Sequence, residues 1–174
     1  HRRKLPTLAV MDCMAPGIVL AQAIGRWGNY FNQELYGKAT TLPWGLKIDA
    51  FPGQTFHPTF LYEFIWDVIG VAVLLWVDRR YKLRRPALFA LYVSWYTAFR
   101  TYEETLRIDP GSHHLWGMRL NFYVSIVCFV LSTAFFVWWQ FVRKPGPDRP
   151  KARPRPLPQG PAMAVPKGRV RPPR

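Results

Sequence analysis

The sequence has few cysteines and few acidic residues, and it lacks the short motifs of nucleotide and metal sites. Two cysteines, Cys13 and Cys128, cannot supply a disulfide framework for 174 residues. No P-loop, HExxH or CxxC motif occurs, so we expect neither a metal nor any other cofactor. Only 10 acidic residues stand against 24 Lys and Arg. Such an excess of cations suggests nucleic acid, an anionic membrane surface or an acidic substrate as partner.

Much of that excess lies in the last 32 residues. Residues 143–174 hold 10 of the 17 prolines and 10 of the 24 basic residues, with Asp148 as the only acid. Proline at this density prevents helix formation, and the segment has too few apolar residues for a core. We therefore predict a disordered, basic, Pro-rich tail over 143–174. Because the remaining basic residues are explained by membrane topology, we expect no nucleic-acid partner.

Long apolar runs fill the rest of the chain. Four runs are apparent, at 8–24, 59–77, 86–99 and 120–142, and the last contains no charge over 23 residues. A helix of about 20 residues spans about 30 Å, the thickness of the hydrocarbon core of a bilayer. The sequence therefore predicts an all-α, polytopic transmembrane helical bundle with four spans, forming one domain over residues 1–142.

The connecting segments predict an orientation. Residues 1–4, the five cations of 78–85 and the tail fall on one side if the four spans alternate, and the positive-inside rule makes that side cytoplasmic. The less basic segments 25–57 and 107–118 then face outward. The chain begins without Met, and we expect it to be the C-terminal portion of a longer membrane protein.

Polar residues gather at the predicted outer ends of three spans. On the third, Arg100, Glu104 and Arg107 lie within an arc of roughly 60° of a helix, with Tyr96 one turn earlier. Such a stripe faces a bundle interior or a water-filled cavity, because charge is costly against lipid. It is either a structural Arg–Glu network or part of a site. Glu103 is expected at the membrane interface.

The segment 25–37, GRWGNYFNQELYG, places Arg26, Asn29 and Glu34 among three glycines. A guanidinium group suits a phosphate better than an ammonium group does. Arg26 is therefore either a headgroup anchor or a member of a site for an anionic lipid. In the plainer interpretation the segment is a capped helix end, with Gly37 as its stop signal.

Further polar residues lie on the first and second spans. His57, just before Pro58, is either a general base, since imidazole exchanges protons near neutral pH, or a helix cap. Glu63 and Asp67 are four residues apart and are expected to pair with Arg26 or Arg100. Asp12 is expected to be buried in a structural role.

Three stretches carry a resemblance to a known family. GRWGNYFNQELYG (25–37), HPTFLYE (57–63) and FRTYEETLR (99–107) resemble, in order and spacing, motifs of the bacterial prolipoprotein diacylglyceryl transferases. The resemblance covers about residues 5–142 and suggests an actinobacterial member, located in the bacterial cell (inner) membrane. The family carries an upstream H-G-G motif, whose His is its proposed base, and this motif is absent here. The resemblance thus implies seven spans in the full protein, and we expect these four spans alone to be inactive.

The resemblance also implies an activity and roles for single residues. The family transfers the diacylglyceryl group of phosphatidylglycerol to the lipobox cysteine thiol of a prolipoprotein signal peptide, the first step of lipoprotein maturation, and glycerol phosphate leaves. The implied phosphatidylglycerol-binding residues are Arg26, Asn29, Glu34, Gly37 and Arg107. The implied catalytic residues are Arg100, Glu104, His57 and Tyr96. An alternative from another class is a non-enzymatic, transporter-like protein that handles lipids or anions.

Overall fold

The computed structural model describes residues 6–108 and 114–143, and most of that range is helical. The helices are α1 (Thr7–Phe31), α2 (Thr59–Arg80), α3 (Ala87–Leu106) and α4 (Leu120–Val137), and a π-helical turn, η1 (Trp138–Val142), continues α4. Within the described ranges, α1, α2 and the segment Leu120–Val142 are long and apolar enough to cross a membrane. A helical membrane protein is thus confirmed. The span predicted from Pro86 forms α3, the least apolar of the four helices.

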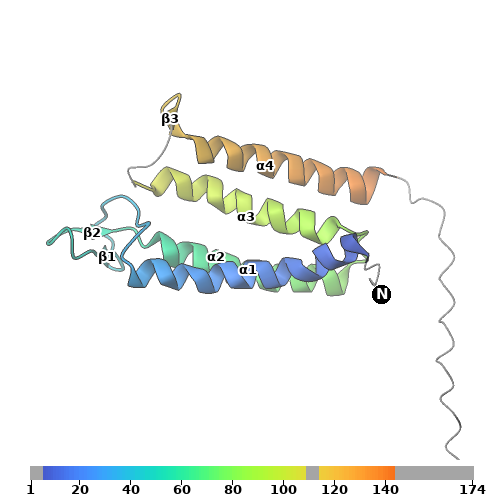
Figure 1. Ribbon diagram of the computed structural model, residues 1–174, viewed down its shortest axis with the longest axis horizontal. Coiled ribbons are helices and arrows are strands. Elements are labelled where there is room, and N and C mark those ends of the chain that lie inside the picture. Colours follow the sequence, from blue (N-terminus) through green and yellow to red (C-terminus); the bar gives the residue numbers. More distant parts are fainter. Residues whose placement is uncertain (1–5, 109–113, 144–174) are drawn as a thin grey trace, which may run out of the picture. The chain divides into compact units, whose positions relative to one another are not determined.

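The four helices run antiparallel to one another along the chain (Figure 1). Helices α1 and α2 lie side by side, and α3 lies between them and α4. The connection after α1 and the hairpin before α4 are therefore at one end of the bundle. The connection from α2 to α3 is at the other end. This alternation is the one that the charge pattern of the connecting segments predicts.

Small and aliphatic side chains form the core between α1, α2 and α3. Ala15 and Val19 of α1 are fully buried against Leu74 of α2 and against Leu88 and Tyr92 of α3. Close van der Waals packing of this kind holds helices together in a bilayer. The hydrophobic effect contributes little to helix association there, because lipid tails are as apolar as the helix surfaces. The outer faces of the helices remain apolar and exposed, as contact with lipid requires.

Two tryptophans join α2 to α3. The rings of Trp66 and Trp95 stack with centroids 4.4 Å apart, and each indole donates to the backbone carbonyl of the other residue, at 3.0 and 3.2 Å. Gly70, one turn beyond Trp66, makes this approach possible, since a Cβ there would lie 2.5 Å from Nε1 of Trp95. The stacked pair fixes the register of α2 against α3 and thereby sets which polar side chains of the two helices meet.

Hydroxyl groups join α3 to α4. The Oγ of Ser94 lies 2.9 Å from Oγ of Ser132 and accepts a hydrogen bond from Thr133 at 3.1 Å. Ser94 is buried on α3. Small hydroxyl-bearing residues are typical of helix contacts in membranes, because they allow close approach and satisfy each other's polar atoms.

Two short hairpins cover the end of the bundle where α1 finishes. Strands β1 (Leu46–Lys47) and β2 (Thr55–Phe56) pair antiparallel, as do β3 (His114–Leu115) and β4 (Met118–Arg119). Trp116 and Gly117, both with positive φ, form the two-residue turn of the second hairpin. Because β4 leads directly into α4, this turn determines where Arg119 lies. Sequence analysis indicated neither hairpin.

The predicted stop of the first helix at Gly37 is wrong. Helix α1 ends at Phe31, and Gln33 (φ 51°) and Leu35 (φ 56°) then adopt the left-handed conformation that turns the chain. Arg26 consequently lies on a regular helix, less than two turns from its end. The helix holds its guanidinium group toward the bundle.

Candidate functional site

Arg26 of α1 and Glu63 of α2 form the first ion pair of the site. A guanidinium nitrogen of Arg26 donates to Oε1 of Glu63, and the same nitrogen lies 3.5 Å from the Tyr96 hydroxyl of α3. The Glu63 side chain is 1% exposed and that of Arg26 is 16% exposed. The predicted pairing of Glu63 with Arg26 is confirmed. One contact thus joins three helices.

Arg100 of α3 connects this pair to two further carboxylates. It donates to Glu103 and, at 2.7 Å, to Oε1 of Glu104, and its Nη1 lies 4.0 Å from Oε2 of Glu63. Glu103 is 2% exposed, so its carboxylate lies inside the bundle, and its place at the membrane interface stays a prediction. Because Glu103 and Glu104 lie three and four residues after Arg100, helical spacing brings both carboxylates to the same guanidinium group.

Glu104 extends the cluster toward the end of the bundle. Its side chain is fully buried, and its oxygens lie 3.8 Å from Nη1 of Arg107 and 3.2 Å from Nε of Arg119. Arg119 is a residue that sequence analysis missed. A signal was present, since it is a cation beside an apolar run on the side that the positive-inside rule leaves poor in cations.

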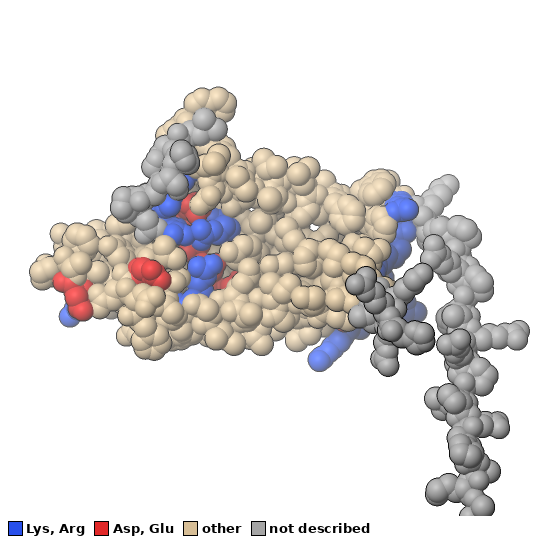
Figure 2. All heavy atoms as spheres, viewed as in Figure 1, with Lys and Arg blue, Asp and Glu red and all other residues tan. Residues whose placement is uncertain are grey.

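We call these seven side chains the Arg–Glu cluster: Arg26, Glu63, Arg100, Glu103, Glu104, Arg107 and Arg119. Figure 2 shows basic and acidic side chains gathered between the helices toward one end of the bundle, whereas the middle of the visible surface is largely uncharged. Within the described ranges, its four guanidinium groups exceed its three carboxylates by one positive charge. A buried cluster with an excess cation is suited to an anionic group, which would balance it.

Gly37 holds the connection after α1 against the end of α3. Its amide donates to the carbonyl of His57 at 2.9 Å, and it forms a bridge with Arg107. A Cβ at this position would lie 2.8 Å from Cβ of His57 and 3.2 Å from the carbonyl oxygen of Leu106. Only glycine therefore fits here. The structure gives Gly37 a packing role beside the cluster and no side chain for a ligand.

Among the described contacts, none joins the side chains of two other predicted residues to the cluster. Glu34 is exposed and accepts a hydrogen bond from the amide of Asn32 at 3.2 Å, and among the described contacts no ion pair joins it to an arginine. Asn29 is half-buried on α1, and its carbonyl accepts from the amide of Glu34 at 3.0 Å. Convergence with Arg26 is therefore not seen for Glu34, and it stays a prediction for Asn29, one helical turn after Arg26.

His57 lies in the connection that precedes α2. Its Nδ1 is 3.2 Å from the Tyr62 hydroxyl, which also accepts a hydrogen bond from the Trp44 indole at 3.0 Å. Its backbone pairs with Gly37 and Lys38. His57 thus lies beside the connection that packs on the end of α3, and the described contacts of its ring are to Tyr62.

Asp12 and Asp67 differ in how they are buried. Oδ1 of Asp12 accepts from the amide of Phe89 at 2.9 Å, which satisfies a first-turn donor of α3 and confirms a structural role. Asp67 is fully buried, and within the described ranges neither carboxylate oxygen has a hydrogen-bond partner. Its predicted pairing with Arg26 or Arg100 is therefore not seen.

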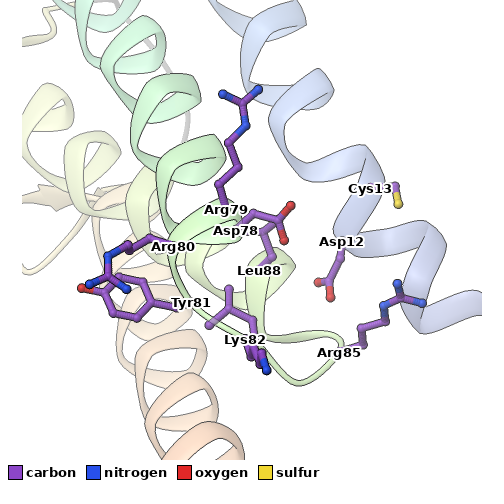
Figure 3. Close-up of a pocket in the computed structure, with 10 residues that line it drawn as sticks. Asp12, Cys13, Asp78, Arg79, Arg80, Tyr81, Lys82, Arg85 and Leu88 are labelled. Carbon is purple, nitrogen blue, oxygen red and sulfur yellow. The ribbon is translucent and has the colours of Figure 1, made fainter.

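A cavity of about 480 Å³ lies at the opposite end of the bundle, between Asp12 and the connection from α2 to α3. In Figure 3, Asp78 is turned toward Asp12, and Arg85 lies beside Asp12. Arg80 lies over the ring of Tyr81, 5.7 Å from its centroid. None of the predicted site residues lines this cavity. Its cations belong to the connecting segment 78–85, which the topology accounts for.

A second cavity, of about 440 Å³, adjoins the Arg–Glu cluster. It is lined by Lys38, Glu104, Thr105, Arg107, Ile108, Gly117, Met118 and Arg119. It lies where α3 ends and α4 begins, so it opens at the end of the bundle that carries the hairpins. Among the described residues, no group of His, Cys, Asp and Glu side chains is arranged to hold a metal ion.

Fold and site together define a helical membrane protein with an arginine-rich polar cluster at one end of its bundle. A sequence model of a family described as prolipoprotein diacylglyceryl transferase matches residues 1–138. The chain belongs to this family.

Named relatives agree with that assignment. The chain is 54% identical over 141 residues to a phosphatidylglycerol–prolipoprotein diacylglyceryl transferase of Streptomyces griseus, covering 79% of this chain and 43% of the relative. It is 56% identical over 140 residues to the protein of the same name from Frankia alni, with 77% and 36% covered, and 51% identical over 136 residues to that of Cutibacterium acnes, with 74% and 46% covered. The chain thus spans less than half the length of these curated relatives.

Proposed function

We propose that the whole protein transfers the diacylglyceryl group of phosphatidylglycerol to the lipobox cysteine thiol of prolipoprotein signal peptides. The names of the relatives support this substrate pair. The observation that carries the proposal is the joining of Arg26 and Arg100 through Glu63 within one buried cluster. Two guanidinium groups from different helices, held by one carboxylate, form a receptor for a phosphodiester.

The cluster has a defined task in this reaction. The thiolate attacks the glyceryl carbon that carries the phosphate, and negative charge grows on the departing phosphate. Guanidinium groups fixed in advance by buried carboxylates stabilise that charge without reorganisation. Arg26 and Arg100 would contact the phosphate. Glu104 would orient Arg100 and Arg107, both of which it contacts, and Arg107 would contribute to lipid binding. The Tyr96 hydroxyl would donate a hydrogen bond to the same phosphate.

The thiol also needs a base, because the thiolate is the nucleophile. His57 and Glu104 are the candidates that this chain offers, and Asn29 and Glu34 stay as proposed contributors to lipid binding. Glu104 lies among three arginines, an arrangement that favours a role in positioning them. His57, with Nδ1 near the Tyr62 hydroxyl, is the better placed of the two for proton exchange.

The proposed membrane topology follows from the charge pattern of the connecting segments. Helix α3 would also cross the membrane, which gives this chain four of the seven spans of the full protein. The end of the bundle with the hairpins and the Arg–Glu cluster would face outward from the cell membrane, and the connection 78–85 and the basic Pro-rich tail 143–174 would be cytoplasmic. Residues 1–142 would form the C-terminal part of the catalytic domain, inactive by itself.

The test is an assay of the full-length protein in membranes with phosphatidylglycerol and a lipobox peptide. Arg26→Ala and Arg100→Ala should each abolish thioether formation at normal expression. The matched control is Arg79→Ala, an exposed arginine at the opposite end of α2, which should keep full activity. Full activity of both site variants would overturn the assignment. No specific observation favours a transporter-like function.

A further inference from the structure

The cavity of about 440 Å³ next to the Arg–Glu cluster is lined by more cationic side chains than binding of a singly charged lipid diester needs. Three cationic side chains, Lys38, Arg107 and Arg119, line it together with one carboxylate, that of Glu104. Glu104 is shared, because Arg100 donates to the same carboxylate at 2.7 Å. Among the described lining residues, cationic side chains therefore outnumber carboxylates by two.

Its position relates it to the proposed diester site. Arg107 directly follows the last residue of α3 and comes seven residues after Arg100, about two helical turns or roughly 10 Å along the axis. Glu104 lies between them and contacts both. Arg119, at the start of α4, reaches the same carboxylate at 3.2 Å. Arginines are thus spaced from the interior of the bundle to its hairpin end, with the cavity at the outer end.

Lys38 marks the mouth of the cavity. Its side chain is exposed, while its backbone is fixed by a 2.9 Å hydrogen bond from its amide to the carbonyl of Leu106 at the end of α3. A flexible ammonium group at a rim attracts a mobile anion from a distance, whereas buried guanidinium groups hold it.

We infer that this cavity is a subsite for the departing glycerol phosphate, an inference that rests on the proposed function. In the transfer, the thiolate sulfur forms a bond to the glyceryl carbon, and the bond from that carbon to the phosphate oxygen breaks with its electron pair left on oxygen. The thiol proton goes to the base. A diester with one negative charge becomes a monoester with a charge of about −1.5 to −2.

The greater negative charge of the product attracts it toward the outer end of the cluster. A monoester interacts more strongly than the diester with the outer end of the cluster, where positive charge is in excess, and the glycerol hydroxyls suit an open polar mouth. The second acidic oxygen of the product exists only after the bond has broken. The subsite thus favours product over substrate and draws the phosphate away from the reacting carbon.

The experiment titrates the purified full-length enzyme with glycerol 1-phosphate by calorimetry. We expect saturable binding, weakened about tenfold in Arg119→Gln, the change that loss of one charge-assisted hydrogen bond gives. Lys38→Gln, at an exposed position where misfolding is not a concern, should weaken binding about threefold, as expected for an exposed charge. Arg119→Lys should recover part of the loss. Lys47→Gln, an exposed lysine on β1 that does not line the cavity, is the matched control and should bind normally.

Several outcomes overturn the inference. One is absence of saturable binding to the unaltered enzyme, and another is normal binding by both Lys38→Gln and Arg119→Gln. Equal affinity for inorganic phosphate would overturn the assignment to glycerol phosphate. If only the subsite assignment is wrong, the unaltered enzyme still forms thioether. An enzyme that forms no thioether instead overturns the proposed function, and with it the product assignment.

Discussion

Nε of Arg119 lies 3.2 Å from Oε2 of Glu104, although Glu104 belongs to α3 and Arg119 ends strand β4 of the hairpin that follows. The same carboxylate lies 2.7 Å from Arg100 and 3.8 Å from Arg107. One fully buried side chain therefore organises the guanidinium groups of the outer half of the cluster. It also ties the hairpin β3–β4 to the end of α3.

Replacing Glu104 should destabilise the protein strongly. Glu104→Gln leaves three guanidinium groups without their shared anion, and breaking a buried ion pair costs about 3–5 kcal/mol. Thermal unfolding of the purified protein in detergent measures the effect. Glu34→Gln is the control, because Glu34 is exposed and hydrogen-bonds Asn32, and it should change the unfolding free energy by less than about 1 kcal/mol. Equal midpoints for the two variants would contradict the role given to Glu104.

Two buried carboxylates lie one turn apart on α2, and neutralising each should have a different effect on the stability of the protein. Glu63→Gln removes the contact that holds Arg26 and Arg100 together, and we expect a loss of about 3–5 kcal/mol and of transferase activity. Asp67→Asn removes a charge that has no hydrogen-bond partner among the described residues, so stability should be unchanged or higher. Denaturation in detergent and the thioether assay compare them directly. Strong destabilisation by Asp67→Asn would indicate a partner outside the described residues.

The sequence predicted the helices well because the bilayer restricts what a long apolar run can form. It also predicted that Arg26, Glu63 and Arg100 would meet, since each has a polar side chain at the same depth. It did not predict that Arg119 joins Glu104, because that contact depends on the hairpin turn at Trp116 and Gly117. Nor did it separate Glu34 from the cluster. Sequence analysis placed all of segment 25–37 at the outer end of one span, whereas α1 ends at Phe31 and the chain then turns.

The glycines of segment 25–37 should not be equivalent. Gly37→Ala places a Cβ 2.8 Å from Cβ of His57, and such overpacking costs about 1–3 kcal/mol. Gly28→Ala is the matched control on α1, because nothing lies within 4 Å of its added Cβ, and alanine in a helix is favoured over glycine by about 0.5–1 kcal/mol. Unfolding midpoints and activity of the two variants should separate clearly. A Gly37→Ala variant as stable as Gly28→Ala would show that the connection can move away from α3.

His57 has two interpretations, as a proton acceptor and as a residue that only supports its loop, and kinetics can separate them. If His57 is the base, His57→Gln should lower kcat by a factor of about 10² to 10⁴, remove the acidic limb of the pH–rate profile and leave the KM for phosphatidylglycerol nearly unchanged. Tyr62→Phe is the matched comparison, because it removes the hydroxyl that lies 3.2 Å from Nδ1 and accepts from Trp44 while keeping the imidazole. Tyr62→Phe should lower kcat less than His57→Gln does and should preserve the acidic limb of the pH–rate profile. Should His57→Gln and Tyr62→Phe give the same small loss with an unaltered profile, His57 supports the loop and the base is contributed by another group.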